Sequence, residues 1–420
     1  MRHLTCSLSV VFVAVFSLPS SSVAKDWPSW RGPDRTAIAP ETGLLKEWPD
    51  NGPPLVWQAD GFGGGFSSVA IVGDRIFTMG ARKGGCELIA ADRATGKELW
   101  ATPVGKGRPN CTPTVDGDLV FALGREGDLL CANALSGSIV WQKNFGEDFG
   151  GKMMSVWGYS ESPLVDGDRL IVTPGAEKAV IVALDKSTGD VIWQSAMPEG
   201  TQQRGKDGAG YSSVVISHAA GVKQYIQLTG RGVISVAADD GRHLWNYNRI
   251  ANGTANIPTP IVKDNFVFCS TGYGTGAALL QIKTDGGKLS ADEVYFLDSK
   301  TMQNHHGGMI LLGDHIYCGH GHNQGFPLCV EMATGNIAWN AGRGPGSGSA
   351  AILLADGNLY FRYEDGTMAL IEATPDEYRL KGEFKLATNN GKSWPHPVIV
   401  DGLMYLRDQG TLLCYDVRQK

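Results

Sequence analysis

The sequence predicts an all-β protein: an eight-bladed β-propeller of four-stranded antiparallel blades, closed by an N-terminal strand. The first observation is a recurring motif, Ala-Thr-Gly-Lys-Glu-Leu-Trp at 94–100, in which glycine precedes tryptophan by four residues. The same spacing ends at Trp141, Trp193, Trp245 and Trp339. The second observation is that the 420 residues include 56 glycines, while few segments have the apolar period of an amphipathic helix. A unit of short strands repeating every roughly 40 to 50 residues is typical of a propeller blade.

Residues 1–24 indicate a cleaved secretory signal. Arg2 supplies the basic end, residues 8–18 are an apolar run, and Ser22-Val23-Ala24 is a small-residue exit. No other segment approaches the ~20 uninterrupted apolar residues that a transmembrane helix needs. We therefore expect cleavage near Ala24, a periplasmic or secreted protein, and no transmembrane segment.

Residues 25–52 are aromatic and turn-rich, and we expect them to form an ordered arm across the finished domain. The four residues around Trp57 then match the last strand of a repeat without the three strands that should precede it. We expect residues 53–60 to complete the last blade of a propeller that spans 53–420. A ring closed in this way leaves no open sheet end.

The repeat is complete from Phe66 onward. Apolar strands are expected at 67–72, 75–79 and 88–91, followed by the strand that carries Trp100. Glycine after Thr, Ser or Asp fits the turns between these strands, because such turns need a residue with positive φ. The eight expected blades begin at Phe66, Cys111, Glu161, Tyr211, Ile257, His306, Ser347 and Trp394.

Three blades depart from the tryptophan pattern. Phe296 and Phe384 are expected to replace the tryptophan in two of them. The blade that begins near Trp394 ends at Tyr415 without a fourth strand, which the segment at Trp57 can supply. The count of blades therefore closes at eight.

Cleavage of the signal would leave seven cysteines, an odd number, so at least one cannot pair within the chain. Most occupy strand positions, where burial as small apolar residues is expected. Aligning the blades places Cys318 opposite Cys329 across a hairpin, so a disulfide between them is the alternative.

The charge pattern gives no indication of a nucleic-acid partner. The formal net charge is -6, and the chain has no basic run and no basic stripe interleaved with aromatic residues. We expect a monomer whose partner is a small polar molecule or an envelope protein.

With these motifs, the chain resembles the PQQ-like repeat propellers, the quinoprotein alcohol dehydrogenase-like superfamily, over residues 53–418. Trp27-Pro28-Ser29-Trp30-Arg31-Gly32-Pro33 and Asn304-His305-His306-Gly307-Gly308 are similar to a secreted bacterial subgroup of PQQ-binding-like repeat proteins. The resemblance implies PQQ with calcium as the cofactor of the dehydrogenase branch. That branch carries two adjacent cysteines over the cofactor, and this chain has none.

The superfamily also includes non-enzymatic scaffolds of outer-membrane β-barrel assembly. Those scaffolds are usually lipoproteins, whereas this chain has no cysteine at the signal exit to accept a lipid. The resemblance therefore predicts the architecture more firmly than the function.

The candidate site lies on one face of the propeller. In an antiparallel four-stranded blade, the connection that enters the first strand and the one between the second and third strands lie on the same face. Five histidines fall between 305 and 322, and four of them belong to such connections. The residues assigned to this face are Arg108, Trp157, Tyr159, Asn256, His305, Trp394 and His396 for binding, Glu161 and His306 for catalysis, and His320 and His322 for a metal.

Three interpretations of this face remain open. The polar residues could cap loop backbones. They could instead form a small-molecule or sugar-like site with aromatic platforms. His320 and His322, with Glu161 and His305 or His306, could hold a metal.

The leading hypothesis is an extracytoplasmic propeller that binds a small polar ligand on this face, with a quinoprotein-like oxidoreductase as its enzymatic form. Glu161 or one of the histidines would then take the substrate proton. The alternative is a non-enzymatic envelope scaffold that binds extended protein segments.

Overall fold

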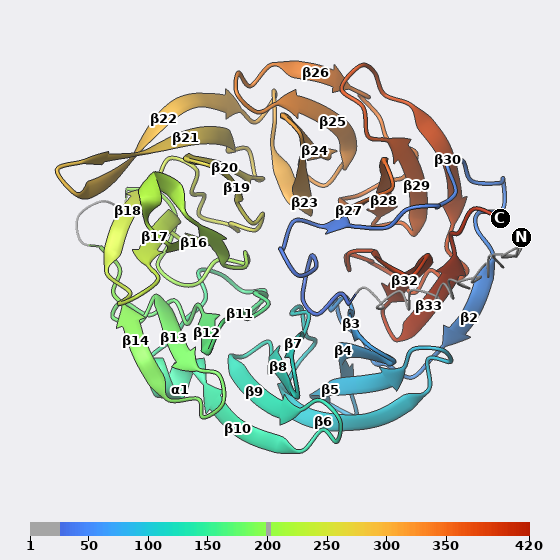
Figure 1. Ribbon diagram of the computed structural model, residues 1–420, viewed down its shortest axis with the longest axis horizontal. Helices are drawn as coiled ribbons and strands as arrows, with labels where there is room; N and C mark the ends of the chain where they lie inside the picture. The colour runs from blue at the N-terminus through green and yellow to red at the C-terminus, as the bar shows by residue number, and fades with distance from the viewer. Residues whose placement is uncertain (1–25, 199–202) are drawn as a thin grey trace, which may run out of the picture.

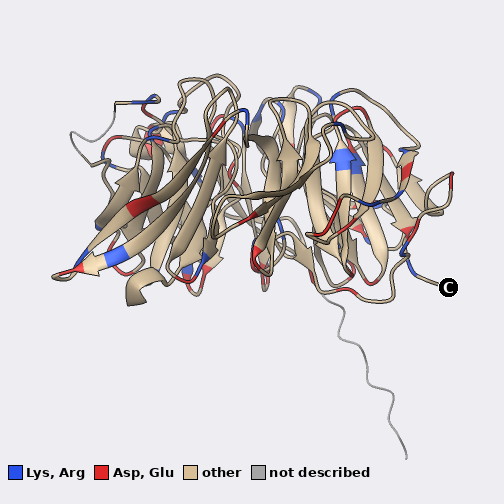
Figure 2. Ribbon diagram, turned by 90° about the horizontal axis from the view of Figure 1, so that it is seen from above, with Lys and Arg blue, Asp and Glu red and all other residues tan. Residues whose placement is uncertain are grey.

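The computed structural model describes residues 26–198 and 203–420. Eight sheets stand in a ring around a central axis, which confirms the predicted eight-bladed propeller (Figure 1). Seven described sheets have four strands, and the remaining one carries β1 as a fifth. Each blade runs from an inner strand near the axis to an outer strand at the rim, and the strands extend between the two faces of the ring (Figure 2).

The blades follow one another in chain order. Blade 1 consists of β3 (Ala70–Val72), β4 (Arg75–Arg82), β5 (Gly85–Asp92) and β6 (Glu98–Lys106), and blade 2 of β7 (Thr114–Asp116), β8 (Leu119–Leu123), β9 (Asp128–Asn133) and β10 (Ile139–Asn144). Blade 3 consists of β11 (Leu164–Asp166), β12 (Arg169–Val172), β13 (Ile181–Asp185) and β14 (Val191–Ser195). Blade 4 consists of β15 (Val215–Ser217), β16 (Gln224–Thr229), β17 (Gly232–Ala237) and β18 (His243–Tyr247).

The second half of the ring repeats the plan. Blade 5 consists of β19 (Ile261–Lys263), β20 (Phe266–Thr271), β21 (Gly276–Asp285) and β22 (Lys288–Asp298), and blade 6 of β23 (Asn304–Leu312), β24 (His315–His320), β25 (Phe326–Glu331) and β26 (Ile337–Asn340). Blade 7 consists of β27 (Ala350–Ala355), β28 (Asn358–Tyr363), β29 (Thr367–Glu372) and β30 (Leu380–Lys385). Blade 8 consists of β31 (Val398–Val400), β32 (Leu403–Asp408), β33 (Thr411–Asp416) and β2 (Leu55–Ala59).

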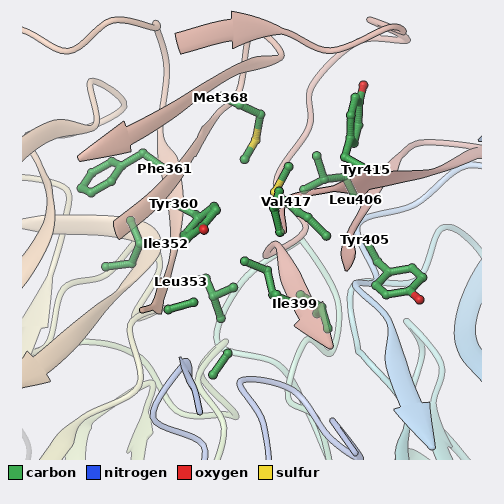
Figure 3. Close-up of a cluster of buried hydrophobic side chains, with 14 of the residues drawn as sticks. Ile352, Leu353, Tyr360, Phe361, Met368, Ile399, Tyr405, Leu406, Tyr415 and Val417 are labelled. Atoms are coloured by element: carbon green, nitrogen blue, oxygen red, sulfur yellow. The ribbon is translucent and has the colours of Figure 1, made fainter. Parts of the chain in front are cut away.

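Blade 8 is closed by the N-terminal strand, as predicted. β2 pairs antiparallel with β33, and Trp57 lies opposite Cys414. The last blade is thus built from both ends of the chain (Figure 1). A core of buried side chains fills the space between blades 7 and 8, where Tyr360 and Tyr405 are almost fully buried (Figure 3).

The glycine and tryptophan of the repeated motif meet across blade boundaries. The ring of Trp100 in blade 1 packs on Gly137 in blade 2, so that a Cβ on this glycine would lie 2.6 Å from the indole. Trp141 packs in the same way on Gly189 of blade 3, at 2.8 Å. Glycine is therefore needed at these turns both for positive φ and for the close approach of the neighbouring indole.

The prediction that Phe296 and Phe384 replace tryptophan is wrong. In the other blades the tryptophan directly follows a β-bulge in the outer strand, and in blade 5 the residue after the bulge is Tyr295. In blade 7 that position is Gly382, and Trp48 from the N-terminal segment packs against it. The two phenylalanines therefore lie beyond the packing position, Phe296 by one residue and Phe384 by two.

Neighbouring blades are also joined by a chain of backbone-to-hydroxyl hydrogen bonds near the axis. The backbone N–H of Ser68 donates to Oγ1 of Thr112 at 3.1 Å, and the N–H of Thr112 donates to Oγ of Ser162 at 3.1 Å. The N–H of Ser162 then donates to Oγ of Ser213 at 2.9 Å, and that of Ser213 to Oγ1 of Thr259 at 3.0 Å. These bonds satisfy buried backbone donors where blades 1 to 4 begin.

The segment after residue 26 crosses the centre of the ring, where it appears in dark blue between blade 1 and blade 7 (Figure 1). Trp27 forms a bridge with Ile71 of blade 1, and β1 (Ile38–Ala39) pairs parallel with β27. Between them, Arg31 donates to the backbone oxygen of Met309 and Arg35 donates to that of Ser162. We call residues 26–39 the arm.

The disulfide alternative is wrong. The cysteines in the described residues are all free and buried. The strand register pairs Cys329 with Tyr317, so Cys318 is one residue out of line. Because neighbouring strand residues point to opposite faces, Cys318 packs toward blade 5 while Cys329 packs toward blade 7.

Helices are scarce in the described chain. The single α-helix there is α1 (Phe145–Phe149), whose first turn is capped by the side chain of Asn144. None of the helices in the described residues is long and apolar enough to cross a membrane.

Candidate functional site

A cavity of about 200 Å³ lies at the centre of the face on which the blade entries gather. Its walls come from the entries of several blades, and Trp30 of the arm forms part of its lining. The hydroxyl residues that join the blades, including Ser68 and Thr259, also line it. The cavity is thus enclosed by elements from all around the ring.

Seven aromatic rings form a continuous chain along the cavity wall, and we call them the aromatic chain. Each ring contacts the next, with centroid separations from 4.2 Å for Phe66 and Trp394 to 6.5 Å for Tyr273 and Trp157. The chain runs in the order Phe66, Trp394, His306, His305, Tyr273, Trp157 and Tyr211. All seven line the cavity.

The histidines of the cavity are held neutral. Burial lowers the pKa of His305 to about 4, with a smaller contribution from the nearby His322 and Lys392. Burial likewise lowers the pKa of His306 well below its ordinary value and that of His396 to about 3. A neutral imidazole has one N–H and one acceptor nitrogen, so it can both give and receive a hydrogen bond.

His305 and His306 differ in their partners. Nδ1 of His305 lies 2.6 Å from Oγ of Ser349, and its Nε2 lies 3.1 Å from the hydroxyl of Tyr273. Nε2 of His306 is buried and has no hydrogen-bond partner in the described part of the chain. His305 is therefore fixed by protein groups, while His306 keeps a polar atom for another molecule.

Trp157 stands at the mouth of the cavity, with 39% of its surface exposed. Nδ2 of Asn110 donates to the backbone oxygen of Trp157 and to Oγ of Ser160, both at 3.0 Å. Arg125 donates to the backbone oxygen of Val156 at 2.8 Å and to that of Trp157. These bonds fix the loop that carries the indole.

Four of the residues predicted for binding or catalysis lie outside the cavity wall. The carboxylate of Glu161, 3% exposed, accepts from the N–H of Thr173 at 2.5 Å. Burial raises the pKa of Glu161 to about 7, although hydrogen bonds from Thr173 and Gln227 and the charge of Arg35 act in the opposite direction. The hydroxyl of Tyr159 donates to the backbone oxygen of Pro174, and the side-chain amide of Asn256 donates to that of Thr229. Arg108 is exposed beside Gly64.

The predicted metal ligands are not brought together. Nδ1 of His320 accepts the backbone N–H of Gln303 at 3.2 Å. The exposed His322 packs its ring 4.4 Å from those of His305 and Tyr273. Across residues 26–198 and 203–420, no group of three or more His, Cys, Asp or Glu residues is placed to hold a metal ion.

The structure brings five of the predicted residues together at the cavity: Trp157, His305, His306, Trp394 and His396. Sequence reasoning missed Trp30, Phe66, Tyr211 and Tyr273. Phe66 and Tyr211 begin blades and were interpreted only as strand entries. Tyr273 lies in the turn between β20 and β21, a connection between second and third strands on the face predicted to hold the site. An aromatic residue in such a connection is the sequence feature that points to it.

The family model described as outer membrane protein assembly factor BamB matches residues 49–123 and 85–341, more than half of the 420 residues. The chain belongs to this family. Its PQQ-like repeats, predicted from the spacing of glycine and tryptophan, are those of this family.

Two curated BamB proteins match short parts of the chain. The protein from Salmonella typhimurium is 32% identical over 105 residues, which cover 23% of this chain and 25% of the relative. The protein from Alteromonas naphthalenivorans is 28% identical over 87 residues, covering 19% and 21%. The matched segments thus span about a quarter or less of each relative.

Solved structures share the fold at low identity. BamB from Moraxella catarrhalis superposes with a TM-score of 0.60 at 13% identity, covering 87% of this chain and 99% of that one. Quinohemoprotein alcohol dehydrogenase from Comamonas testosteroni gives 0.63 at 14% identity, covering 94% and 81%. A europium-containing methanol dehydrogenase gives 0.65 at 11% identity, covering 92% and 90%.

The cavity of this BamB-family member does not fit PQQ with calcium. Calcium in proteins is bound by six to eight oxygens, with carboxylates prominent among them. No Asp or Glu is among the described residues that line the cavity, and Arg125 is its single formally charged lining residue. The metal would therefore lack its usual ligands, and Arg125 alone would face the several acidic groups of the quinone.

Proposed function

We propose that the protein is an exported envelope protein whose aromatic chain binds one small, uncharged, ring-shaped polar molecule of the sugar type. The observation that carries the proposal is the seven-ring wall around a cavity with an unpartnered nitrogen, Nε2 of His306. Sugars combine apolar ring faces, which suit aromatic platforms, with hydroxyl edges, which need hydrogen-bonding groups.

The charge of the site supports an uncharged ligand. The cavity lining holds no carboxylate in the described residues, and its histidines are neutral because burial lowers their pKa values. The neutral imidazole of His306 can accept from one ligand hydroxyl or donate to it. Trp394 is the best-placed platform, since it stacks with Phe66 at 4.2 Å and contacts His306 at 4.7 Å.

Binding, rather than proton abstraction, is the proposed activity. A histidine whose pKa lies well below its ordinary value is a weak base at neutral pH. Glu161 has a pKa near neutrality, but its carboxylate is enclosed by Thr173 and Gln227 away from the cavity.

The test is a titration of residues 25–420 with glucose, N-acetylglucosamine and the open-chain polyol mannitol, followed by tryptophan fluorescence and calorimetry. We expect the ring sugars to quench fluorescence with millimolar or stronger affinity, and mannitol to have no effect because it offers no ring face. His306→Ala should abolish the response, whereas the matched variant His243→Ala, at an exposed outer-strand position, should retain it. Equal responses of the two variants, or of mannitol and the sugars, would contradict the proposal.

A second candidate function follows from the family. The relatives are named outer membrane protein assembly factors, and this chain could serve as a scaffold for proteins of the envelope. Neighbouring outer strands expose pairs of apolar residues: Ile139 and Val140 in β10 are 49% and 48% exposed, and Val191 and Ile192 in β14 are 47% and 45% exposed. Clustered exposed apolar side chains are typical of interaction sites.

Capture experiments from a detergent-solubilised envelope separate the two functions. The scaffold function predicts that one outer-membrane protein is retained by wild type and by His306→Ala, and is lost from the double variant Val140→Asp, Ile192→Asp. Retention by the double variant would exclude this surface as the scaffold's binding site.

A further inference from the structure

A second cavity, of about 340 Å³, lies on the other side of the arm. The aromatic cavity is lined by blade-entry residues such as Ser213 and Thr259 and by Trp30 of the arm. The second cavity is lined by residues further along the same inner strands, such as Ile216 and Ile261, and by arm residues 31 and 33–36. The arm thus divides the central channel into two chambers, and we call this one the lower chamber.

Two buried arginines line the lower chamber. Arg31 is 4% exposed and Arg35 is 6% exposed. Arg31 donates to the oxygens of Thr36 and Met309, and Arg35 donates to backbone oxygens of blades 3 and 4. Neither forms an ion pair with a carboxylate of the described chain, and Nε of each is buried without a hydrogen-bond partner there.

The surroundings leave this positive charge largely uncompensated. Burial lowers the pKa values of Arg31 and Arg35 to about 10, so both stay protonated at neutral pH. The one acid that acts on Arg35 is Glu161, which is itself partly protonated near neutrality because burial raises its pKa to about 7. Asp34 also lines the chamber but is exposed to solvent. Because buried charges are unfavourable without a counter-charge, the chamber favours an anion.

Apart from Asp34 and Thr36, the rest of the wall is apolar. Inner strands of blades 3 to 6 contribute branched side chains, among them Leu164, Ile216, Val262 and Leu311. A multiply charged, strongly hydrated anion would lose its water against such a wall without replacement. A single acidic group with a short apolar tail matches both parts of the surface.

We propose that the lower chamber is a second ligand site, which binds a small monocarboxylate carrying a short apolar tail, with the carboxylate toward Arg31 and Arg35. This site is separate from the aromatic cavity and does not depend on the sugar proposal. A free short-chain fatty acid and the C-terminal residue of an apolar peptide share this chemistry. The carboxylate supplies the missing counter-charge, and the tail displaces water from the branched side chains.

Calorimetric titration of residues 25–420 with hexanoate tests the site. Acetate is the control that keeps the carboxylate but lacks the apolar chain, and 1-hexanol is the control that keeps the chain but lacks the carboxylate. We expect the dissociation constant of hexanoate to be at least about tenfold lower than those of acetate and 1-hexanol. N-acetyl-leucine represents a peptide C-terminus, and its affinity relative to hexanoate distinguishes the two sources. No hexanoate binding up to about 10 mM, or equal affinity for 1-hexanol, would overturn the proposal.

Two adjacent substitutions locate the binding. Leu311 lines the chamber, while its neighbour Leu312 is 37% exposed and points to the opposite face of the strand. Leu311→Trp should fill the chamber and weaken hexanoate binding by at least about tenfold, and Leu312→Trp should leave it unchanged. Arg35→Met, checked for folding by circular dichroism, should weaken binding of hexanoate but not of 1-hexanol. Hexanoate binding that survives Leu311→Trp would place the ligand elsewhere and refute the site.

Discussion

Replacing Gly137 by alanine tests whether the indole of one blade locks against the turn of the next. Gly137 has a φ of 73°, and a Cβ there would lie 2.6 Å from the ring of Trp100 and 2.8 Å from Oγ1 of Thr102. The left-handed backbone costs a non-glycine residue about 1–2 kcal/mol. Overpacking against the partly buried ring adds about 1–3 kcal/mol. We therefore expect Gly137→Ala to lower the free energy of unfolding by about 2–5 kcal/mol.

The matched control is Gly117→Ala, since Gly117 has a φ of 56° but nothing within 4 Å of an added Cβ. It should lose only the backbone contribution, about 1–2 kcal/mol. Urea unfolding followed by tryptophan fluorescence and by circular dichroism gives both values. If the two variants unfold at the same urea concentration, the indole contact contributes nothing and the explanation of the repeat is refuted.

Three further predictions concern the buried Glu161, Trp48 of the N-terminal segment and the loop that carries Trp157. Burial raises the folded-state pKa of Glu161 from 4.5 to about 7, so the folded protein holds this proton more tightly than the unfolded chain. The free energy of unfolding of the wild type should therefore fall by at most about 3 kcal/mol as the pH rises from 4.5 through 7. Glu161→Gln should match wild type in unfolding free energy at pH 5 and exceed it at pH 8; parallel curves would contradict this. Trp48→Ala should cost about 3–5 kcal/mol in thermal unfolding, because the buried indole packs against the rings of Tyr360 and Phe384, and an unchanged midpoint would show that these contacts are dispensable. Asn110→Ala should weaken N-acetylglucosamine binding by about tenfold, because the loop of Trp157 loses its fastening; unchanged affinity would show that the loop is fixed by other bonds.

The architecture could be predicted from the sequence because the residues that specify it form a short motif that repeats along the chain. The spacing from Gly96 to Trp100 recurs since each copy must make the same turn and present the same ring to the next blade. The strand at Trp57 could be recognised as an orphan because every other copy has three strands before it. Where the contact comes from outside the repeat, as with Trp48 on Gly382, the pattern predicted the wrong residue.

The site residues could be predicted only in part. Side chains in a strand alternate between its two faces, but side chains in the loops that enter the blades follow no such rule. Ser160 lines the cavity, while its neighbours Tyr159 and Glu161 turn into the protein, toward Pro174 and Thr173. The sequence analysis assigned Tyr159 and Glu161 to this face and did not single out Ser160. Which of them reaches the axis depends on how the loop is fastened by Asn110, a contact between blades.

The fold class, the number of blades and the closure by an N-terminal strand follow from local sequence, because they depend on a motif whose turn chemistry and packing repeat along the chain. The three-dimensional arrangement is needed to see that Trp30 completes an aromatic cavity and that Arg31 and Arg35 line a second chamber. Those assignments require a segment from one end of the chain to cross the axis of a ring formed by all the rest. Such contacts join residues that are far apart in sequence, and no local pattern carries them.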